Sequence, residues 1–298
     1  LDKVSRMWRE RLDIDGLLER IESGSMETVV CDTETSWCDE WAKHEIGELD
    51  SVSMAVAGGA LADRLAWVFH AGYQAMMRCA FPFCPRDGWS SYLVAEDRSG
   101  EYPAVVLERT ANGNWLSGCK SWVAASEHVD HMVVRAICED HHEYVVVERE
   151  TPGIGLSSRE SPSFLPELSQ GFAVFESVAV DEKQLFSREH LSNNFSGEEP
   201  YHVLLALSAY MAAQTGAHGG SLTAEIVAPI RLARQLADNK DDGDYFTKGV
   251  ALLDKATTTA ALEFELFIEH KNDELFRRWE RDKRLVNMFT RGLQKRAK

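Results

Sequence analysis

Four histidines lie beside acidic residues, in an arrangement that could bind a metal ion: His128, His131, His141 and His142. Imidazole nitrogens and carboxylates are common protein ligands of zinc and related ions. In an alternating strand, however, His128 and His131 would point to opposite faces of the sheet. His141 and His142 fall in an expected hairpin turn. We therefore predict that these histidines form no metal site.

The cysteines could also bind a metal or form disulfides. Both kinds of framework use close, patterned spacing, and no CxxC pair occurs here. Scattered cysteines are typical of reduced thiols, which predicts a cytoplasmic protein. All six fall in the first half of the chain: Cys31, Cys38, Cys79, Cys84, Cys119 and Cys138.

The charge of the chain argues against some partners. A formal net charge of −16 over 298 residues does not suit nucleic acid, because phosphate binding needs clustered Lys and Arg. The exception is the basic tail, residues 277–298. Positive charge there complements the negative end of a helix dipole, and an anionic ligand or an acidic partner subunit stays open as an alternative.

Membrane and targeting segments are not expected. No apolar run approaches the ~20 residues that span a bilayer. The opening residues 1–3 (LDK) begin no basic segment followed by an apolar run, so we expect no signal peptide. The chain does not begin with Met, which leaves the completeness of the N-terminus open.

The elements that position these residues fall into three blocks, of which the first is helical. Apolar residues from Trp8 to Ile21 recur at helical spacing, and Gly24 interrupts them. Residues 51–80 predict a buried helix pair, with Gly58-Gly59 as the candidate for the break between the helices. Pro82 and Pro85 should end the second helix.

The middle block has the pattern of short strands. β-branched and aromatic residues gather in runs separated by polar, Gly or Pro turns such as 112–114 and 151–153. Six or seven strands at this spacing predict a compact barrel or sandwich. The clearest runs are residues 92–95, 104–107, 131–134, 144–147 and 172–175.

The last block is helical again. The expected fold is therefore α+β: an N-terminal helical domain (1–88), a middle β-barrel or sandwich domain (89–190) and a C-terminal helical bundle (191–298). Within the last domain we predict a helix that closes near Gly216, a helix that Pro229 could kink, and a polar loop over 238–244. The expected helices are 201–215, 223–236, 246–269 and 275–295.

Residues 112–123 (NGNWLSGCKSWV) are the most distinctive stretch. Gly113 and Gly118 suit tight turns in which φ is positive. Trp115, Leu116 and Trp122 supply a large apolar area for a β core. By itself the stretch predicts a well-formed hairpin.

With residues 128–134, this stretch resembles the middle-domain motif of the acyl-CoA dehydrogenase superfamily, G-x-(aromatic)-x-(apolar)-x-G-x-K-x-W-(apolar). Residues 171–186 resemble the family's closing strand, F-x-x-V-x-V-P-x-x-x-L, with Asp181 in place of Pro. Residues 281–284 (RDKR) are similar to the R-D motif that opens its last long helix. The resemblance covers roughly residues 50–298. It implies an acyl-CoA dehydrogenase-like fold, FAD as cofactor, and a homodimer or homotetramer.

Flavin-binding positions carry over only in part. The family's T-E-P-x-x-G-S-D segment, whose hydroxyls hold the flavin, matches residues 95–102 (AEDRSGEY), with Arg98 as a candidate positive charge. Its W-I-T/S segment matches residues 122–124 (WVA), with Ser126 nearby. Hydroxyl donors are therefore missing at both segments, and the Ser-Asp pair is replaced by Glu101-Tyr102. The resemblance implies these cofactor-binding residues: Ala95, Glu96, Gly100, Trp122, Val123 and Ala124.

The remaining family motifs depart further. A glycine-rich turn that contacts a neighbouring subunit's cofactor is replaced by residues 263–270, which predict a continuous helix. The position of the family's catalytic glutamate is occupied by Thr290, whose hydroxyl cannot act unaided as a general base. General-base catalysis typically accelerates a reaction by ~10²–10⁴-fold. Candidate replacement bases are Glu225, Glu263 and Glu265.

His70 belongs to the helix that flanks the substrate pocket in this family. It is a candidate pocket residue, and the alternative is an ordinary core histidine.

Two functions follow from these features. The first is an FAD- or FMN-dependent oxidoreductase that acts on an acyl thioester or, as in the monooxygenase-like branch of the family, on a small aromatic molecule. The second is a non-catalytic family member that has lost FAD and serves as a binding or scaffold subunit. In both cases the resemblance implies a homo-oligomer assembled through the C-terminal helices, and the apolar residues 203–213 and 252–267 fit burial in a helical bundle.

Overall fold

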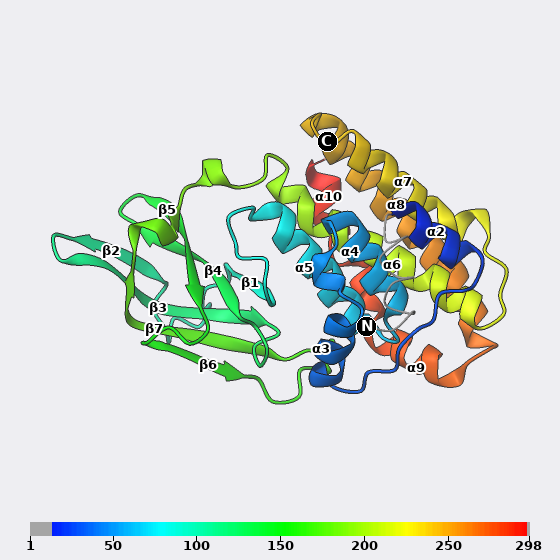
Figure 1. Ribbon diagram of the computed structural model, residues 1–298, viewed down its shortest axis with the longest axis horizontal. Coiled ribbons are helices and arrows are strands. Elements are labelled where there is room, and N and C mark those ends of the chain that lie inside the picture. The colour runs from blue at the N-terminus through cyan, green and yellow to red at the C-terminus, as the bar shows by residue number, and fades with distance from the viewer. Residues whose placement is uncertain (1–13, 297–298) are drawn as a thin grey trace. The chain divides into compact units, whose positions relative to one another are not determined.

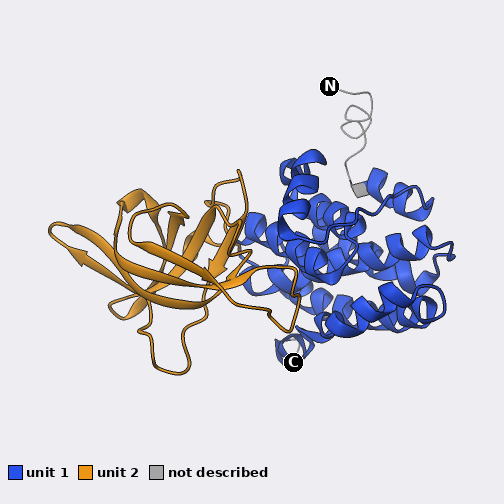
Figure 2. Ribbon diagram, turned by 90° about the horizontal axis from the view of Figure 1, so that it is seen from below, with its two compact units in different colours: residues 1–80, 193–298 blue, residues 81–192 orange. Residues whose placement is uncertain are grey.

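The computed structural model describes residues 14–296, which form two compact units (Figure 2). Residues 14–80 and 193–296 make the helical unit, and residues 81–192 make the β unit. The chain therefore leaves the helical unit once and returns to it. The helical stretches before and after the strands pack into one unit, and the division into three domains remains a proposal.

The first helical stretch contains two capped helices, α3 and α4, and its buried helices are α4 and α5. Thr33 begins α3 by accepting a hydrogen bond from the Ser36 amide, and Asp50 begins α4 by accepting from the amides of Val52 and Ser53. Pro82 follows the end of α5, as predicted. The elements are α2 (Ile14–Glu22), α3 (Glu34–Lys43), η1 (Ile46–Glu48), α4 (Ser51–Leu61) and α5 (Leu65–Ala80).

The expected break at Gly58-Gly59 is wrong. α4 continues through both glycines, and the chain turns between Leu61 and Leu65 instead. A Cβ at Gly59 would overlap the carbonyl oxygen of Ala206 on α6. The glycine therefore serves close packing between two helices, and it breaks neither of them.

The second helical stretch is built around α6, which packs against α4, α5, α7 and α8 (Figure 1). Its residues from Tyr201 to Thr215 are all buried, so this helix is surrounded by protein on every side. The elements are α6 (Phe195–Ala217), α7 (Ala224–Asp238), α8 (Gly243–Glu269), α9 (Asp273–Asp282), η4 (Lys283–Asn287) and α10 (Thr290–Arg296).

α6 begins six residues before the predicted start at Tyr201. Pro200 lies inside it and cannot bond to the Ser196 carbonyl one turn earlier. The Arg296 guanidinium donates to that carbonyl. A contact from the far end of the chain thus satisfies the group that proline leaves unbonded.

The last predicted helix, 275–295, is also corrected. It divides into α9, η4 and α10, and Arg281-Asp282 ends α9, where the family motif was expected to open a long helix. Asp282 is buried and accepts hydrogen bonds from the guanidinium of Arg281. The loop before α8 covers residues 239–242, which is shorter than expected. No helix among residues 14–296 is both long and apolar enough to span a bilayer.

The β unit is one mixed eight-stranded sheet, ordered β6-β7-β3-β2-β4-β5-β8, with β1 paired to β4. Its longest pairing is the antiparallel ladder between β3 and β7. The strands are β1 (Ser90–Leu93), β2 (Val106–Thr110), β3 (Gly113–Ala124), β4 (His131–Cys138), β5 (His141–Glu148), β6 (Ile154–Ser158), β7 (Gln170–Val180) and β8 (Leu185–Phe186).

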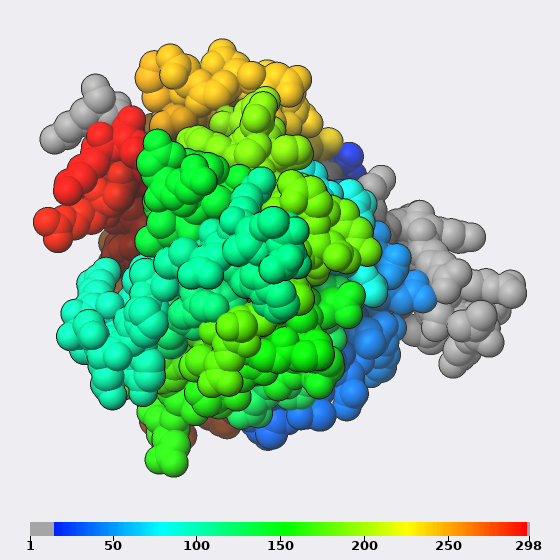
Figure 3. Space-filling model, turned by 90° about the vertical axis from the view of Figure 1, so that its left-hand side faces the viewer, coloured from blue at the N-terminus to red at the C-terminus, as the bar shows by residue number. Residues whose placement is uncertain are grey.

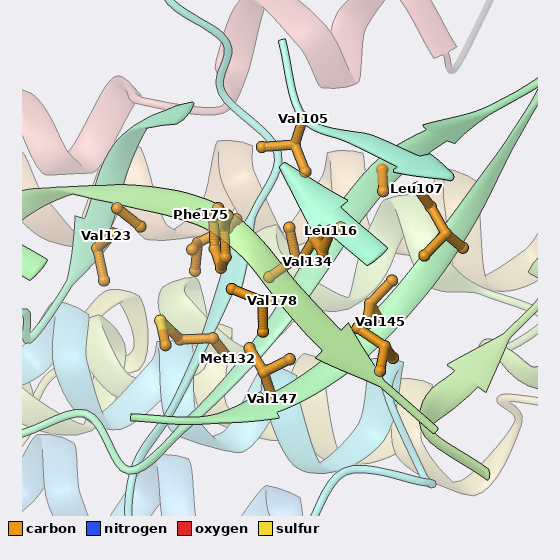
Figure 4. Packing of buried hydrophobic residues seen from close by; sticks show 14 of the residues in the cluster. Val105, Leu107, Leu116, Val123, Met132, Val134, Val145, Val147, Phe175 and Val178 are labelled. Atoms are coloured by element: carbon orange, nitrogen blue, oxygen red, sulfur yellow. The ribbon is translucent and has the colours of Figure 1, made fainter. Parts of the chain in front are cut away.

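A single apolar cluster fills this unit. Leu116, Val134, Val145 and Phe175, from four different strands, all contribute to it (Figure 4). Because strands from the whole sheet send side chains into one cluster, the sheet folds over its own core, as the predicted barrel or sandwich requires. Removing the apolar surface of these side chains from water provides the main stabilisation of the β unit.

Gly118 lies inside β3, where a turn was expected. The register shifts between Leu116 and Gly118, which marks a β-bulge. The φ angle of Gly118 is +128°, and a Cβ there would overlap the Ala104 carbonyl oxygen. Both the backbone conformation and the close approach therefore require glycine.

Candidate functional site

An open pocket of about 900 Å³ lies on the β unit, whose surface is cyan and green in Figure 3. This size is within the range of small-molecule sites. The loop after β1, the end of β3, β7 and the loop after β6 form it. Its lining residues are Val94, Ala95, Glu96, Asp97, Arg98, Ser99, Ser121, Trp122, Arg159 and Phe172.

Three of the predicted flavin-binding residues share this pocket: Ala95, Glu96 and Trp122. Ser121 of β3 holds the loop after β1 in place through two hydrogen bonds. Its amide donates to the Ala95 carbonyl over 2.9 Å, and its hydroxyl donates to the Glu96 carbonyl over 2.9 Å. Two segments that are distant in sequence are thereby held side by side.

A half-buried ion pair joins the loop after β1 to β3. Lys120, from β3, is fully buried and its Nζ donates to Glu96 Oε1. Burial lowers the pKa of Lys120, and the hydrogen bond from Lys120 to Glu96 opposes that effect. Because the ammonium has no exposure to water, the Glu96 carboxylate is its main compensation.

The pocket also contains a fixed positive charge that the sequence analysis missed. The guanidinium carbon of Arg159 lies 4.5 Å from the centre of the Phe172 ring, and its Nη2 donates to the Ser121 carbonyl over 2.6 Å. Both contacts orient the guanidinium at the pocket wall. The only signal in the sequence was that Arg159 is the sole basic residue between positions 151 and 169.

Gly100 does not line this pocket. It lies in the exposed tip of the loop with a φ of +79°. The Asp97 carboxylate organises that tip by accepting from the Ser99 hydroxyl and from the amides of Ser99, Tyr102 and Glu101, which lowers its pKa to about 2. The Ser99 hydroxyl is therefore already engaged.

Val123 and Ala124 are buried and do not line the pocket either. Val123 belongs to the core of the β unit. The Ala124 amide donates to Ser91 Oγ over 3.1 Å. Ser126, the nearby hydroxyl, contacts Ser158 Oγ at 2.9 Å. The hydroxyl that is missing at position 124 has no substitute here.

These residues fit a flavin in some respects. Trp122 lines the pocket with an aromatic side chain, and Arg98 and Arg159, the latter stacked on Phe172, supply positive charge for an anionic group. Donors for the polar edge of the ring are fewer, because neither Ala95 nor Ala124 carries a hydroxyl. The pocket therefore offers apolar contact and positive charge to a flavin, but few hydrogen-bond donors to the polar edge of the flavin ring.

The position of the family's catalytic base has a structural role. Thr290 begins α10, and its hydroxyl donates to Asp254 Oδ1 over 3.0 Å. Asp254 is buried in α8, and burial raises its pKa while the Thr290 hydrogen bond opposes that effect. The threonine thus joins α10 to α8.

The three replacement bases differ in their contacts. Glu225 is exposed, and Glu263 accepts from the Thr223 hydroxyl over 2.8 Å. Burial raises the pKa of Glu265, but hydrogen bonds from Trp279 and Lys283 outweigh it and leave the pKa lowered. These contacts are those of helix caps and ion pairs.

Glu199, half-buried in α6, is a carboxyl group with a raised pKa, but it does not line the pocket. Burial raises the pKa of Glu199 to about 7, with Arg296 opposing. A group with that pKa exchanges protons readily near neutral pH. The sequence analysis missed Glu199, although an acidic pair directly before Pro200 and a long apolar run is a signal for a partly buried carboxylate.

His70 has the contacts of a core histidine. It is buried in α5, and Trp37 Nε1 donates to its Nδ1 over 3.1 Å. Its ring meets that of Trp41 edge to face, with centres 5.2 Å apart. A role in a substrate pocket remains a proposal.

The four histidines considered at the outset are placed differently from expectation. His128 lies in a turn, and His131 begins β4. His141 and His142 are the first residues of β5, where the sequence predicted a turn. None of the four belongs to a group of three or more potential metal ligands among the described residues. Across residues 14–296, the one such group consists of Cys79, Glu198 and His202.

Comparisons with known proteins identify the fold. No family model and no curated protein matches the chain. Butyryl-CoA dehydrogenase from Megasphaera elsdenii aligns with a TM-score of 0.68 at 13% identity, over 100% of this chain and 97% of that one. An FAD complex of PigA aligns with a TM-score of 0.65 at 11% identity, over 100% and 97%.

A third solved structure agrees. A glutaryl-CoA dehydrogenase from Mycobacterium smegmatis, in complex with FADH2, aligns with a TM-score of 0.61 at 12% identity, over 97% of this chain and 91% of that one. The chain therefore has an acyl-CoA dehydrogenase-like fold, as its motifs predicted. Identities this low establish the fold alone.

Proposed function

We propose that this protein is an acyl-CoA dehydrogenase-like oxidoreductase whose β-unit pocket binds FAD, and that its substrate is an acyl thioester. The observation that carries the proposal is the convergence of Ala95, Glu96 and Trp122 on one pocket, beside the fixed guanidinium of Arg159. The fold supports it, because similar structures contain FAD or FADH2.

Each pocket residue has a proposed role. Trp122 packs against the ring system, Phe172 supports the guanidinium of Arg159, and Arg159 and Arg98 neutralise the anionic part of the cofactor. Lys120 and Glu96 position the loop that forms one wall. When bound, a flavin would accept the electrons that leave the substrate.

A flavin titration tests this proposal. Replacing Arg159 with glutamine removes a charge-assisted contact, and we expect the Kd for FAD to rise by ~10-fold or more. The Kd would be measured from the quenching of flavin fluorescence by the full chain. Arg188→Gln is the matched control, since Arg188 is exposed on the same unit and does not line the pocket. Equal affinities in the two variants would contradict the role of Arg159.

A second candidate function is a non-catalytic binding or scaffold subunit without FAD. It is favoured by the missing hydroxyls at Ala95 and Ala124 and by the engagement of the Ala124 amide with Ser91. In that case purified protein would be colourless, and neither FAD nor FMN would shift its thermal unfolding.

We also propose a homodimer or homotetramer in the cytoplasm, whose six cysteines form no disulfide bonds. One face of the 27-residue helix α8 supports the assembly. Leu252, Leu262 and Leu266 on that face are 59%, 64% and 65% exposed. Large apolar side chains lined along one helix are typical of a surface that another subunit covers.

Charges on this face should dissociate the assembly. We expect Leu262→Glu/Leu266→Glu to shift the full chain to monomers, because association would bury two unpaired carboxylates. Sedimentation velocity measures the shift. Lys295→Glu changes the net charge equally at an exposed site on α10 and should leave the mass unchanged. A wild-type chain that is already monomeric at micromolar concentration would refute the proposal.

A further inference from the structure

The helical unit contains a cluster of three side chains with the chemistry of a metal site. Cys79 comes from the end of α5, and Glu198 and His202 lie one turn apart on α6. One potential ligand atom of each lies within 4.8 Å of those of the other two. Sulfur, oxygen and nitrogen ligands together suit Zn²⁺ and similar divalent ions.

His202 is prepared for such a role. Its ring is fully buried, and Nδ1 lies 2.8 Å from the Glu198 carbonyl oxygen, which can only accept a hydrogen bond. Nδ1 therefore carries the proton, and Nε2 has no hydrogen-bond partner among the described residues. Metal-binding histidines commonly donate one N–H to a carbonyl in this way. A buried nitrogen without a partner is costly unless it has another use.

A positive charge already occupies the cluster. Lys240 Nζ lies 2.7 Å from Glu198 Oε2 and 2.9 Å from Cys79 Sγ. The ammonium thus contacts two of the three potential ligands. Its side chain is 21% exposed and extends from the loop between α7 and α8, so it has a route to solvent. Glu198, by contrast, is fully buried and needs a cation beside it.

We propose that Cys79, Glu198 and His202 form a binding site for a divalent Zn²⁺-like ion, which replaces the Lys240 ammonium. On binding, the Cys79 thiol loses its proton to solvent, and Lys240 swings outward while remaining protonated. The ion then neutralises the thiolate and the carboxylate together. The exchange keeps Glu198 paired in both states.

Cobalt(II), as a spectroscopic substitute for zinc, tests the site in the full chain. We expect one equivalent to produce a thiolate-to-cobalt charge-transfer band. Cys79→Ser should abolish this band and weaken binding by ~100-fold or more. Cys38→Ser is the matched control and should leave the band unchanged. The proposal is overturned if the wild-type chain gives no band, or if the band survives in Cys79→Ser.

Lys240→Met provides an independent test. Without the competing ammonium, we expect the affinity for Co²⁺ or Zn²⁺ to increase by about tenfold. The variant without metal should unfold at a lower temperature, because Glu198 loses its countercharge, and Zn²⁺ should restore more stability to it than to the wild type. Unchanged affinity, or no restoration by Zn²⁺, would mean that Lys240 is a permanent structural partner. Neither result bears on flavin binding by the β unit.

Discussion

Glu96→Gln should destabilise the protein by about 3 kcal/mol, and Lys120→Met should cost less, roughly 2 kcal/mol. The asymmetry follows from burial. Lys120 has no exposure, so an ammonium without its carboxylate has no solvent to compensate it. The Glu96 side chain is 38% exposed, so a carboxylate without its ammonium is partly solvated. Urea denaturation of each variant measures the two effects.

The double variant Lys120→Met/Glu96→Gln is the control for this pair. It removes both charges, so most of the loss caused by Glu96→Gln should be recovered. A loss in the double variant equal to the sum of the two single losses, about 5 kcal/mol, would show that the two side chains contribute independently. We also expect Glu96→Gln to weaken FAD binding, because the loop that carries Ala95 loses its anchor.

The pair also predicts a pH dependence. Burial lowers the pKa of Lys120 in the folded state, so the unfolded chain binds more protons between that pKa and 10.5. Stability should therefore rise as pH increases through this interval. The increase in unfolding free energy with pH should be steeper in Glu96→Gln, because the carboxylate no longer opposes the lowering of the Lys120 pKa. In the double variant this increase should disappear, because position 120 no longer titrates.

Gly59→Ala should lower the stability of the helical unit by about 3 kcal/mol, near the upper end for overpacking. The added methyl group would overlap the Ala206 carbonyl oxygen, which belongs to the backbone of α6 and cannot rotate away. α4 and α6 would have to separate along a fully buried contact. Thermal unfolding should show a decrease of roughly 5–10 °C.

Gly216→Ala is the matched control. Gly216 lies near the end of α6, and the nearest atom to a Cβ there is 3.4 Å away, an ordinary contact. Alanine in a helix is favoured over glycine by about 0.5–1 kcal/mol, so this variant should be neutral or slightly more stable. If both variants lost stability equally, the close approach at Gly59 would not be the cause.

Gly58-Gly59 illustrates why part of the fold could not be predicted. Two adjacent glycines are a local signal for a break, and the sequence analysis interpreted them in that way. The use of Gly59 is set by Ala206, which lies on a helix almost 150 residues away in the chain, and that of Gly58 by Ala71 on α5. The start of α6 is a similar case, because Arg296 satisfies the carbonyl that Pro200 leaves unbonded.

The candidate site likewise contains residues that the motifs predicted and residues that only the structure shows. The motifs placed Ala95, Glu96 and Trp122 together, and all three line the pocket. They could not identify Arg159, which reaches Ser121 only because β6 and β7 bring its loop to the edge of β3. Nor could they show that the Ala124 amide is already engaged by Ser91.

By itself, the sequence determined where most helices and strands lie and which fold they build. Apolar periodicity, prolines and turn residues act over a few positions, so their signals are readable locally, as Pro82 after α5 shows. Only the tertiary structure decided which buried charge meets which partner, as buried Lys120 meets Glu96 and buried Glu198 meets Lys240. Such pairs depend on strand register and helix packing, which bring distant residues within bonding distance and remove water around them.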